Sequence, residues 1–123
     1  MEIRELTKAE EEIMQKLWTL GNAFVKDIIE ELPEPKPAYN TVSTIIRILE
    51  NKGFVAHESF GKSHQYYPLI DRDTYKGFAT KKLVSSYFED SPQNMLSFFL
   101  ENKEMDTKEL DQIMKILEKA KKK

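Results

Sequence analysis

Residues 39–53 (YNTVSTIIRILENKG) carry the side chains whose types and spacing point most clearly to a chemical role. At helical spacing their polar members share one face, which would present short hydrogen-bonding groups and a single arginine. These polar residues are Asn40, Ser43, Thr44, Arg47 and Asn51. Asn and Arg pair bidentately with adenine and guanine edges in the major groove of DNA. The stretch therefore predicts a DNA recognition helix. The alternative is an ordinary solvent-facing helix, because Ser, Thr and Asn are moderate helix formers.

The other face of this predicted helix is apolar and would pack against a core. Val42, Ile45, Ile46 and Leu49 follow the i, i+3, i+4, i+7 spacing of a buried stripe. Residues 33–37 (PEPKP) precede the helix and, being rich in proline, predict a stiff extended connector. A linker between independent domains is the alternative, but two short helices alone would have no core. Gly53 is a natural C-terminal stop.

Two further helices are expected before the proline-rich connector. Residues 7–10 (TKAE) form a capping-box pattern, in which the Thr hydroxyl and the Glu carboxylate each accept a backbone N–H. The helix that starts there has the apolar stripe Ile13, Met14, Leu17 and Trp18. Residues 24–32 predict a second, shorter helix.

A β-hairpin is expected after the recognition helix. Residues 54–59 and 64–68 are rich in aromatic and alternating side chains, and Gly61 lies in the turn between them. Three helices followed by a hairpin form a winged helix-turn-helix. The hairpin would be the wing, and Lys62 and Ser63 at its tip would lie near DNA phosphates, although Lys62 could equally be a solvated turn residue.

Catalytic and metal-binding patterns are missing from the sequence. We find no glycine-rich phosphate loop, no Ser/His/Asp arrangement and no HExxH pattern, and we therefore expect no enzyme activity. His57 and His64 could lie near one another on paired strands, but two histidines without a third ligand make a poor metal site. We expect neither a metal nor a cofactor.

The C-terminal part of the chain is expected to be a helical dimerisation region. Residues 71–88 predict a long helix, Ser91 followed by Pro92 starts another, and residues 106–109 (DTKE) cap a last one. Three aromatic-rich helices of this length cannot bury their apolar surface alone, and a second copy of the chain is the simplest partner. The expected contact residues are Tyr75, Phe78, Leu83, Tyr87, Met95, Phe98, Phe99, Leu110, Ile113, Met114 and Leu117.

The chain is therefore expected to be mainly α-helical with a small β-hairpin. Residues 1–70 would be an N-terminal winged helix-turn-helix domain, and residues 71–123 a C-terminal α-helical dimerisation domain. The net charge of −2 gives no global attraction to DNA, so binding would depend on a local basic patch. The charged N-terminus, the lack of a long apolar run and the absence of cysteine predict a cytoplasmic protein.

Three stretches together resemble the penicillinase-repressor family of bacterial winged-helix regulators (BlaI/MecI, with the copper-responsive CopY branch). They are residues 6–18 (LTKAEEEIMQKLW), residues 41–55 (TVSTIIRILENKGFV) and residues 64–70 (HQYYPLI). The spacing of the C-terminal helices agrees as well. The resemblance implies a homodimeric repressor that binds a palindromic operator in double-stranded DNA through its winged helix.

The resemblance also implies functional residues and a mode of regulation. The predicted helix and wing supply the expected DNA contacts, of which Thr41 and Thr44 match the family pattern. These expected contacts are Tyr39, Asn40, Thr41, Ser43, Thr44, Arg47, Lys62 and Ser63. Family members typically carry Lys and Arg where this chain has Asn40 and Ser43, so we expect a different operator. In the β-lactam branch a membrane sensor-protease triggers cleavage of the repressor. The matching bond would lie near Phe98 and Phe99, although the family's Asn is absent there. The cysteine cluster of the copper branch is also absent.

The leading interpretation is thus a dimeric, sequence-specific repressor that controls antibiotic-resistance or stress genes. The alternative is a winged helix used for protein–protein contact, which the acidic N-terminal half slightly favours. A steep loss of affinity with salt would separate the two, because counterion release belongs to phosphate contacts.

Overall fold

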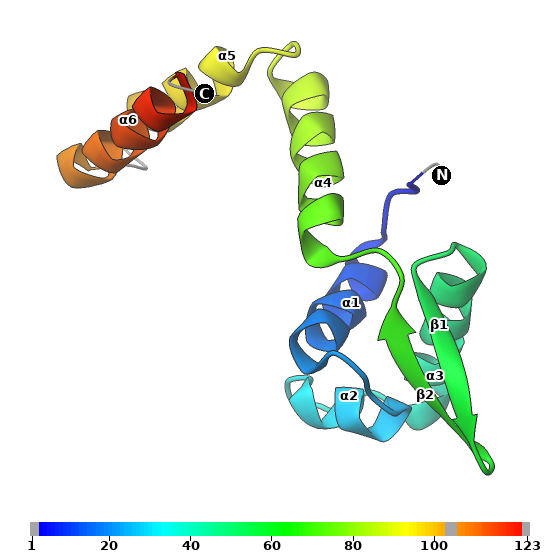
Figure 1. Cartoon of the computed structure of the whole chain (residues 1–123). Helices are drawn as coiled ribbons and strands as arrows, with labels where there is room; N and C mark the ends of the chain where they lie inside the picture. Colours follow the sequence, from blue (N-terminus) through cyan, green and yellow to red (C-terminus); the bar gives the residue numbers. More distant parts are fainter. Residues whose placement is uncertain (1–2, 103–105, 122–123) are drawn as a thin grey trace. The chain divides into compact units, whose positions relative to one another are not determined.

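The computed structural model describes residues 3–102 and 106–121, with side chains described up to residue 116. Six helices and one antiparallel hairpin make up this part of the chain (Figure 1). Their bounds are α1 Lys8–Leu20, α2 Val25–Glu31, α3 Tyr39–Asn51, β1 Val55–Phe60, β2 Ser63–Pro68, α4 Arg72–Tyr87, α5 Pro92–Glu101 and α6 Thr107–Lys121. The mainly helical class with one hairpin is therefore confirmed.

The chain divides into two compact units, residues 1–79 and residues 80–123. The first unit holds α1, α2, α3 and the hairpin, whose tip projects beyond the helices in Figure 1. The helix α4 runs across the division, so its first turns belong to the first unit. No helix in the part of the chain that is described has both the length and the apolar character to cross a membrane.

One apolar core holds the first unit together. Side chains from all three helices and from both strands enter it, together with Phe54, Ile70 and Tyr75. The fully buried members include Met14, Leu17, Ile28, Val42, Ile46, Leu49, Phe54 and Val55. The stripes predicted on α1 and α3 are thus the buried faces, with Trp18 and Ile45 only partly buried. Burial of this apolar area is the main force that fixes α3 against the scaffold.

The helix α1 begins at the capping box that the sequence predicts. The Glu10 amide donates to the Thr7 hydroxyl at 3.2 Å, and the Glu10 carboxylate accepts the Thr7 amide at 3.0 Å. Near the other end of the helix the Trp18 indole donates to the Ile70 carbonyl at 2.9 Å. These bonds satisfy groups that a helix end or a half-buried indole would otherwise leave unpaired.

The end of α3 is fixed by Gly53 and Phe54. Gly53 has a φ of +84°, a conformation that L side chains rarely adopt, and the Phe54 amide donates back to the Leu49 carbonyl at 2.9 Å. This is the Schellman arrangement, in which a glycine ends the helix and the next residue returns to it. Phe54 thereby enters the core while the chain turns into β1.

The hairpin is tied to the start of α2 as well as to itself. Its register pairs Val55 with Pro68 and Phe60 with Ser63. Ala23 and Tyr66 exchange backbone hydrogen bonds of 2.9 and 2.8 Å, which form an isolated antiparallel β-bridge at the edge of β2. The wing is therefore attached on one side to the scaffold that carries α3.

Two residues that the sequence assigned to the dimerisation region lie in the first unit. The Tyr75 hydroxyl accepts the Leu6 amide at 3.0 Å, and the Tyr75 ring is 6% exposed. Its centroid lies 5.6 Å from that of Phe54 and 5.6 Å from that of Phe78. Burial by their own chain removes Tyr75 from the surface available to a partner and leaves Phe78 only partly exposed.

The second unit leaves much of its apolar surface exposed. Leu83, Tyr87, Phe98, Phe99, Leu100, Met114 and Ile116 are all more than a third exposed. Met95, Leu110 and Ile113 are half-buried, and the side chain of Leu117 lies outside the described residues. Within the unit the Phe88 and Phe98 ring centroids lie 5.7 Å apart. A helix pair with this much uncovered apolar surface has an incomplete core.

A half-buried ion pair joins α1 to the end of α3. The Lys52 ammonium lies 2.7 Å from the Glu10 carboxylate, whose side chain is 7% exposed. Burial raises the pKa of Glu10, but the hydrogen bonds from Lys52 and Thr7 outweigh it and the pKa is lowered from its ordinary 4.5. The pair therefore stabilises the fold above about pH 4.5, and this contribution is lost as the pH falls further.

Replacing Lys52 by methionine is expected to lower the free energy of unfolding by about 1–3 kcal/mol at pH 7, because the buried carboxylate loses its partner. The deficit should shrink at a pH well below 4.5, because the lowered pKa of Glu10 delays its protonation until then. Urea unfolding at the two pH values measures it, with Lys81→Met, at an exposed position of α4, as the control. An equal deficit at both pH values would contradict the assignment.

Candidate nucleic-acid interface

The polar face of α3 is exposed. It is the surface that the sequence predicts to contact DNA. Tyr39, Asn40, Thr41, Thr44 and Arg47 are exposed on it. Ser43 is half-buried between this face and the hairpin. The core side of the same helix is closed by Val42, Ile46 and Leu49. The packing of the apolar side therefore decides which side chains a nucleic acid could reach.

Two hydrogen bonds within α3 hold its polar side chains in place. The Thr44 hydroxyl donates to the Asn40 carbonyl at 2.8 Å. The Arg47 guanidinium donates to the Ser43 hydroxyl at 3.3 Å. A guanidinium has five N–H donors, so one bond to Ser43 leaves others for a base edge or a phosphate. The Ser43 hydroxyl thus orients the Arg47 side chain and leaves its other N–H donors available.

A groove of about 410 Å³ runs between α3 and the hairpin. Its walls come from the start of α2, the outer side of α3 and both strands. The lining residues are Val25, Tyr39, Ser43, Arg47, Glu50, His57, Lys62, His64 and Tyr66. Four residues predicted from the sequence therefore lie on one concave surface, although Lys62 is many residues from α3 along the chain.

The charges along this groove favour an anion. Arg47 and Lys62 supply two permanent cations, and Glu50 supplies the one carboxylate among the lining residues. Glu50 already has a partner, since its carboxylate lies 2.6 Å from Nδ1 of His57. A cationic groove of this kind attracts phosphate even where the whole molecule carries a net charge of −2. The acids of the N-terminal half therefore do not decide the potential here.

Tyr66 is a buried residue that lines the groove. Burial raises the pKa of Tyr66, the Glu50 carboxylate raises it further, and Arg47 acts in the opposite direction. The phenol therefore stays protonated at neutral pH and keeps its hydrogen-bond donor. Its backbone also forms the bridge to Ala23, which attaches this part of β2 to the chain just before α2.

The other predicted residues lie beside the groove. Asn40, Thr41 and Thr44 are exposed on α3 outside the set that lines it. Ser63 lies in the hairpin next to Lys62 and lines an adjoining pocket. The groove and the outer side of α3 together give a surface on which a duplex could lie. Contact of any of these residues with DNA stays a prediction.

Several side chains of this surface were not singled out from the sequence. Ile48 is 40% exposed, and its spacing of four residues from Thr44 would have placed it there. An exposed aliphatic group on such a face can contact a thymine methyl. Glu50 continues the spacing of Ser43 and Arg47, and could have been found in the same way.

The two histidines lie together, as the strand pairing predicts. The His57 and His64 rings are parallel to within 9°, with centroids 4.1 Å apart. Across the described residues, no group of three or more His, Cys, Asp or Glu side chains is arranged to hold a metal ion. The stacked pair therefore forms part of the groove wall.

Comparison with known proteins agrees with this architecture. The family model described as penicillinase repressor matches residues 6–119. The methicillin resistance regulatory protein MecI of Staphylococcus aureus (strain N315) is 28% identical over 116 residues, which covers 94% of each chain. The penicillinase repressor of Bacillus licheniformis is 26% identical over 120 residues, or 97% of this chain and 94% of that protein.

Solved structures match part of the chain. The solution structure of the DNA-binding domain of the repressor BlaI has a TM-score of 0.53 and 28% identity, covering 60% of this chain and 92% of that one. The monomeric form of Bacillus licheniformis BlaI in complex with the blaP half-operator has a TM-score of 0.50 and 28% identity, with the same coverage.

The family match spans both units, and the structural matches are to a winged-helix DNA-binding domain. The resemblance seen in the sequence is thereby confirmed. The family consists of transcriptional repressors and not of enzymes. This chain belongs to the penicillinase repressor family, and it is a DNA-binding transcriptional repressor.

Proposed function

We propose that two copies of the chain bind one operator with two half-sites. Each copy would place α3 in the major groove and the tip of the hairpin against the adjoining backbone. A single observation carries this proposal, namely that Arg47 and Ser43 of α3 share a cationic groove with Lys62 of the hairpin. A base-reading helix beside a phosphate-binding wing is what a winged helix needs to read a duplex.

The division of labour between these residues follows from their chemistry. Asn40 and Arg47 can pair with adenine and guanine edges, whereas Thr41, Thr44 and Ser43 can serve bases or phosphates. Tyr39, Lys62 and Ser63 would bind the sugar-phosphate backbone. The blaP half-operator bound by the Bacillus licheniformis relative supports a half-site for each copy.

Binding to the DNA upstream of the chain's own gene tests this function. A labelled fragment would be titrated at several salt concentrations against unrelated competitor DNA. We expect tight binding that resists the competitor and falls steeply with salt, as phosphate contacts require. Weak binding that is equal on both DNAs and insensitive to salt would favour a winged helix used for contact with another protein.

The second copy would cover the apolar surface of the second unit. Leu83, Tyr87, Phe98, Phe99 and Met114 are exposed there, and such a surface is typical of an interface between copies. In a homodimer, two recognition helices about 34 Å apart would be separated by one turn of DNA, which is the spacing of two half-sites. The homodimer is therefore part of the same proposal.

Replacing Met114 by glutamate is expected to raise the dissociation constant of the dimer by about tenfold or more, because a charge would be buried in an apolar interface. Gln112→Glu adds the same charge at another exposed position of α6 and serves as the control. Sedimentation equilibrium of both variants gives the constants. Equal dimerisation by the two variants would place the interface elsewhere.

Cleavage by a membrane sensor-protease is a further proposal for release from DNA. Phe98 and Phe99 are 49% and 37% exposed within α5, where the resemblance places the cut. Helical backbone must open locally before a protease can act on it. Mass spectrometry of the chain after co-expression with a membrane metalloprotease encoded nearby would show fragments that end at these residues. An intact chain under inducing conditions would exclude this route.

A further inference from the structure

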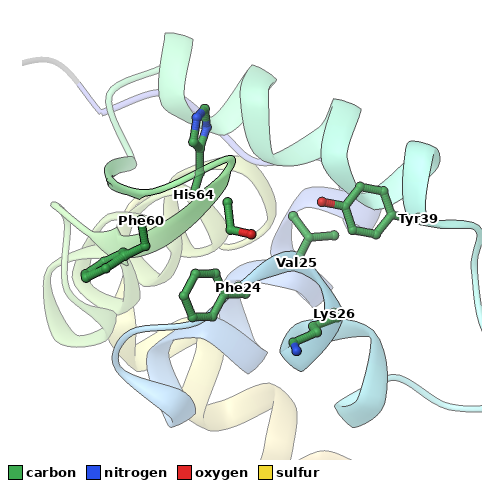
Figure 2. A pocket seen from close by; sticks show the side chains of 7 residues that line it. Phe24, Val25, Lys26, Tyr39, Phe60 and His64 are labelled. Atoms are coloured by element: carbon green, nitrogen blue, oxygen red, sulfur yellow. The ribbon is translucent and has the colours of Figure 1, made fainter.

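A second concave site lies beside the groove between α3 and the hairpin. It is a pocket of about 370 Å³ between the start of α2, the start of α3 and the tip of the hairpin. Figure 2 shows Phe24, Phe60 and Tyr39 around it, with Lys26 on one side and His64 on another. Val25 and Ser63 complete the lining. Of the lining residues, Val25 belongs to the core, whereas Lys26, Tyr39, Phe60, Ser63 and His64 are exposed.

The walls of this pocket are aromatic. The Phe24 and Phe60 rings meet edge to face, with centroids 6.1 Å apart and planes at 71°. Phe60 is 51% exposed and Tyr39 is 58% exposed, so both rings keep apolar area that the protein itself does not cover. A planar aromatic ligand can use such rings for stacked or edge-to-face contact.

The polar groups of the pocket are matched to an anion. Lys26 brings an ammonium and His64 an imidazole, and the lining contains no carboxylate. Asp27, the nearest acid along α2, is occupied because its carboxylate accepts the Phe24 amide at 2.9 Å. In the described part of the chain no ion pair joins Lys26 to an acid. The ammonium is therefore available to a ligand.

We propose that this pocket binds a small aromatic carboxylate. The ring would lie against Phe24 and Phe60, and the carboxylate would pair with Lys26. A volume of about 370 Å³ is at the lower end for ligand sites, which favours a compound with one ring. Charge-assisted bonds to a carboxylate are stronger than neutral ones, so the acid should bind better than a neutral compound of the same shape.

Occupancy of the pocket would weaken DNA binding. Tyr39 and Ser63 line the pocket and also belong to the predicted DNA surface, so a bound acid would compete with phosphate for this surface. This second step rests on the proposed function. Because coupling between two ligands is reciprocal, operator DNA would lower the affinity for the acid by the same factor.

Benzoate is the probe for the first step. Titration of the isotope-labelled full chain, followed by NMR, should give saturable shifts at Phe24, Lys26 and Phe60, with a Kd of about 1–10 mM for so small a ligand. Benzamide tests the charge and cyclohexanecarboxylate tests the ring, and both should bind at least about threefold more weakly. Shifts that do not saturate, or that are equal for all three compounds, would overturn the proposal.

Exposed positions allow variants that leave the core intact. Lys26→Gln and Phe60→Ser should each weaken benzoate binding by about threefold to tenfold. Lys8→Gln and Tyr67→Ser are the matched controls, since neither residue lines the pocket, and they should bind benzoate normally. Equal effects of the variants and their controls would show that benzoate does not bind in this pocket.

Operator DNA separates this inference from the proposed function. If benzoate binds free protein and releases DNA, and Phe60→Ser prevents the release, both steps hold. If benzoate binds but DNA affinity is unchanged, the pocket is real and the coupling is wrong. If the pocket residues shift with DNA and never with benzoate, the site is part of the DNA surface and the inference fails, while the repressor function stands.

Discussion

Replacing Phe54 by alanine is expected to lower the free energy of unfolding by about 3–5 kcal/mol, the largest single effect that this structure predicts. Phe54 is completely buried, and its ring meets the Tyr75 ring edge to face at 5.6 Å. Alanine would leave a cavity below the end of α3, where the Phe54 carbonyl also accepts the Leu69 amide at 2.8 Å. The backbone bonds hold the cavity open, which makes relaxation around it difficult.

Urea unfolding followed by circular dichroism measures this loss. Phe60→Ala is the matched control, because it removes the same ring from a position that is 51% exposed, and its cost should stay below about 1 kcal/mol. Small domains are typically stable by about 5–15 kcal/mol, so Phe54→Ala should lose a large share of the stability of the first unit. A cost for Phe54→Ala close to that of Phe60→Ala would mean that the core is less tightly packed than described.

The sequence predicts this scaffold well because its local rules agree with its packing. The start of α1 is marked by Thr7 with Glu10, and the end of α3 is marked by Gly53 before Phe54. Each pattern lies within about one helical turn of sequence. The apolar stripes follow the helical period closely enough to identify the buried faces. Such signals depend on neighbours in the chain, so they can be found without the fold.

Side chains whose partners are distant in sequence were harder to place. Tyr75 has the spacing of a dimer contact on α4, yet its hydroxyl accepts the amide of Leu6, far away along the chain. Where the Tyr75 side chain packs depends on the path of residues 69–72, and no periodic sequence pattern predicts that path. A helix that crosses from one unit to the next carries one continuous stripe, and periodicity alone cannot divide it between two cores.

The candidate site was predicted in its parts but not as a surface. Tyr39, Ser43 and Arg47 follow from the spacing of α3, and Lys62 follows from the hairpin turn. Their arrangement around one groove depends on the twist of the hairpin and on the bridge between Ala23 and Tyr66. The aromatic pocket depends on the same bridge, because it brings the start of α2 beside the wing. Neither feature has a signature in the sequence.

Replacing Arg47 by alanine is expected to cost about 1–3 kcal/mol of operator affinity, or roughly 5-fold to 150-fold, and to relax the preference for one base pair. The Arg47 side chain is exposed on α3 and is aligned by a 3.3 Å bond to Ser43, so a bidentate pair with guanine would need little reordering. Arg4→Ala removes the same charge outside the groove and should change affinity much less.

The variant Lys62→Ala separates recognition of bases from sequence-independent attraction of phosphates at this groove. Lys62 at the tip of the hairpin should serve any sequence equally, so its loss should weaken operator and unrelated DNA alike and reduce the salt slope by about one. Arg47→Ala should instead weaken the operator more than unrelated DNA. Titrations of both variants on both DNAs at several salt concentrations supply the comparison. If Arg47→Ala left operator affinity unchanged, another face of the winged helix would have to dock on DNA, and the cationic groove would lose its assigned role.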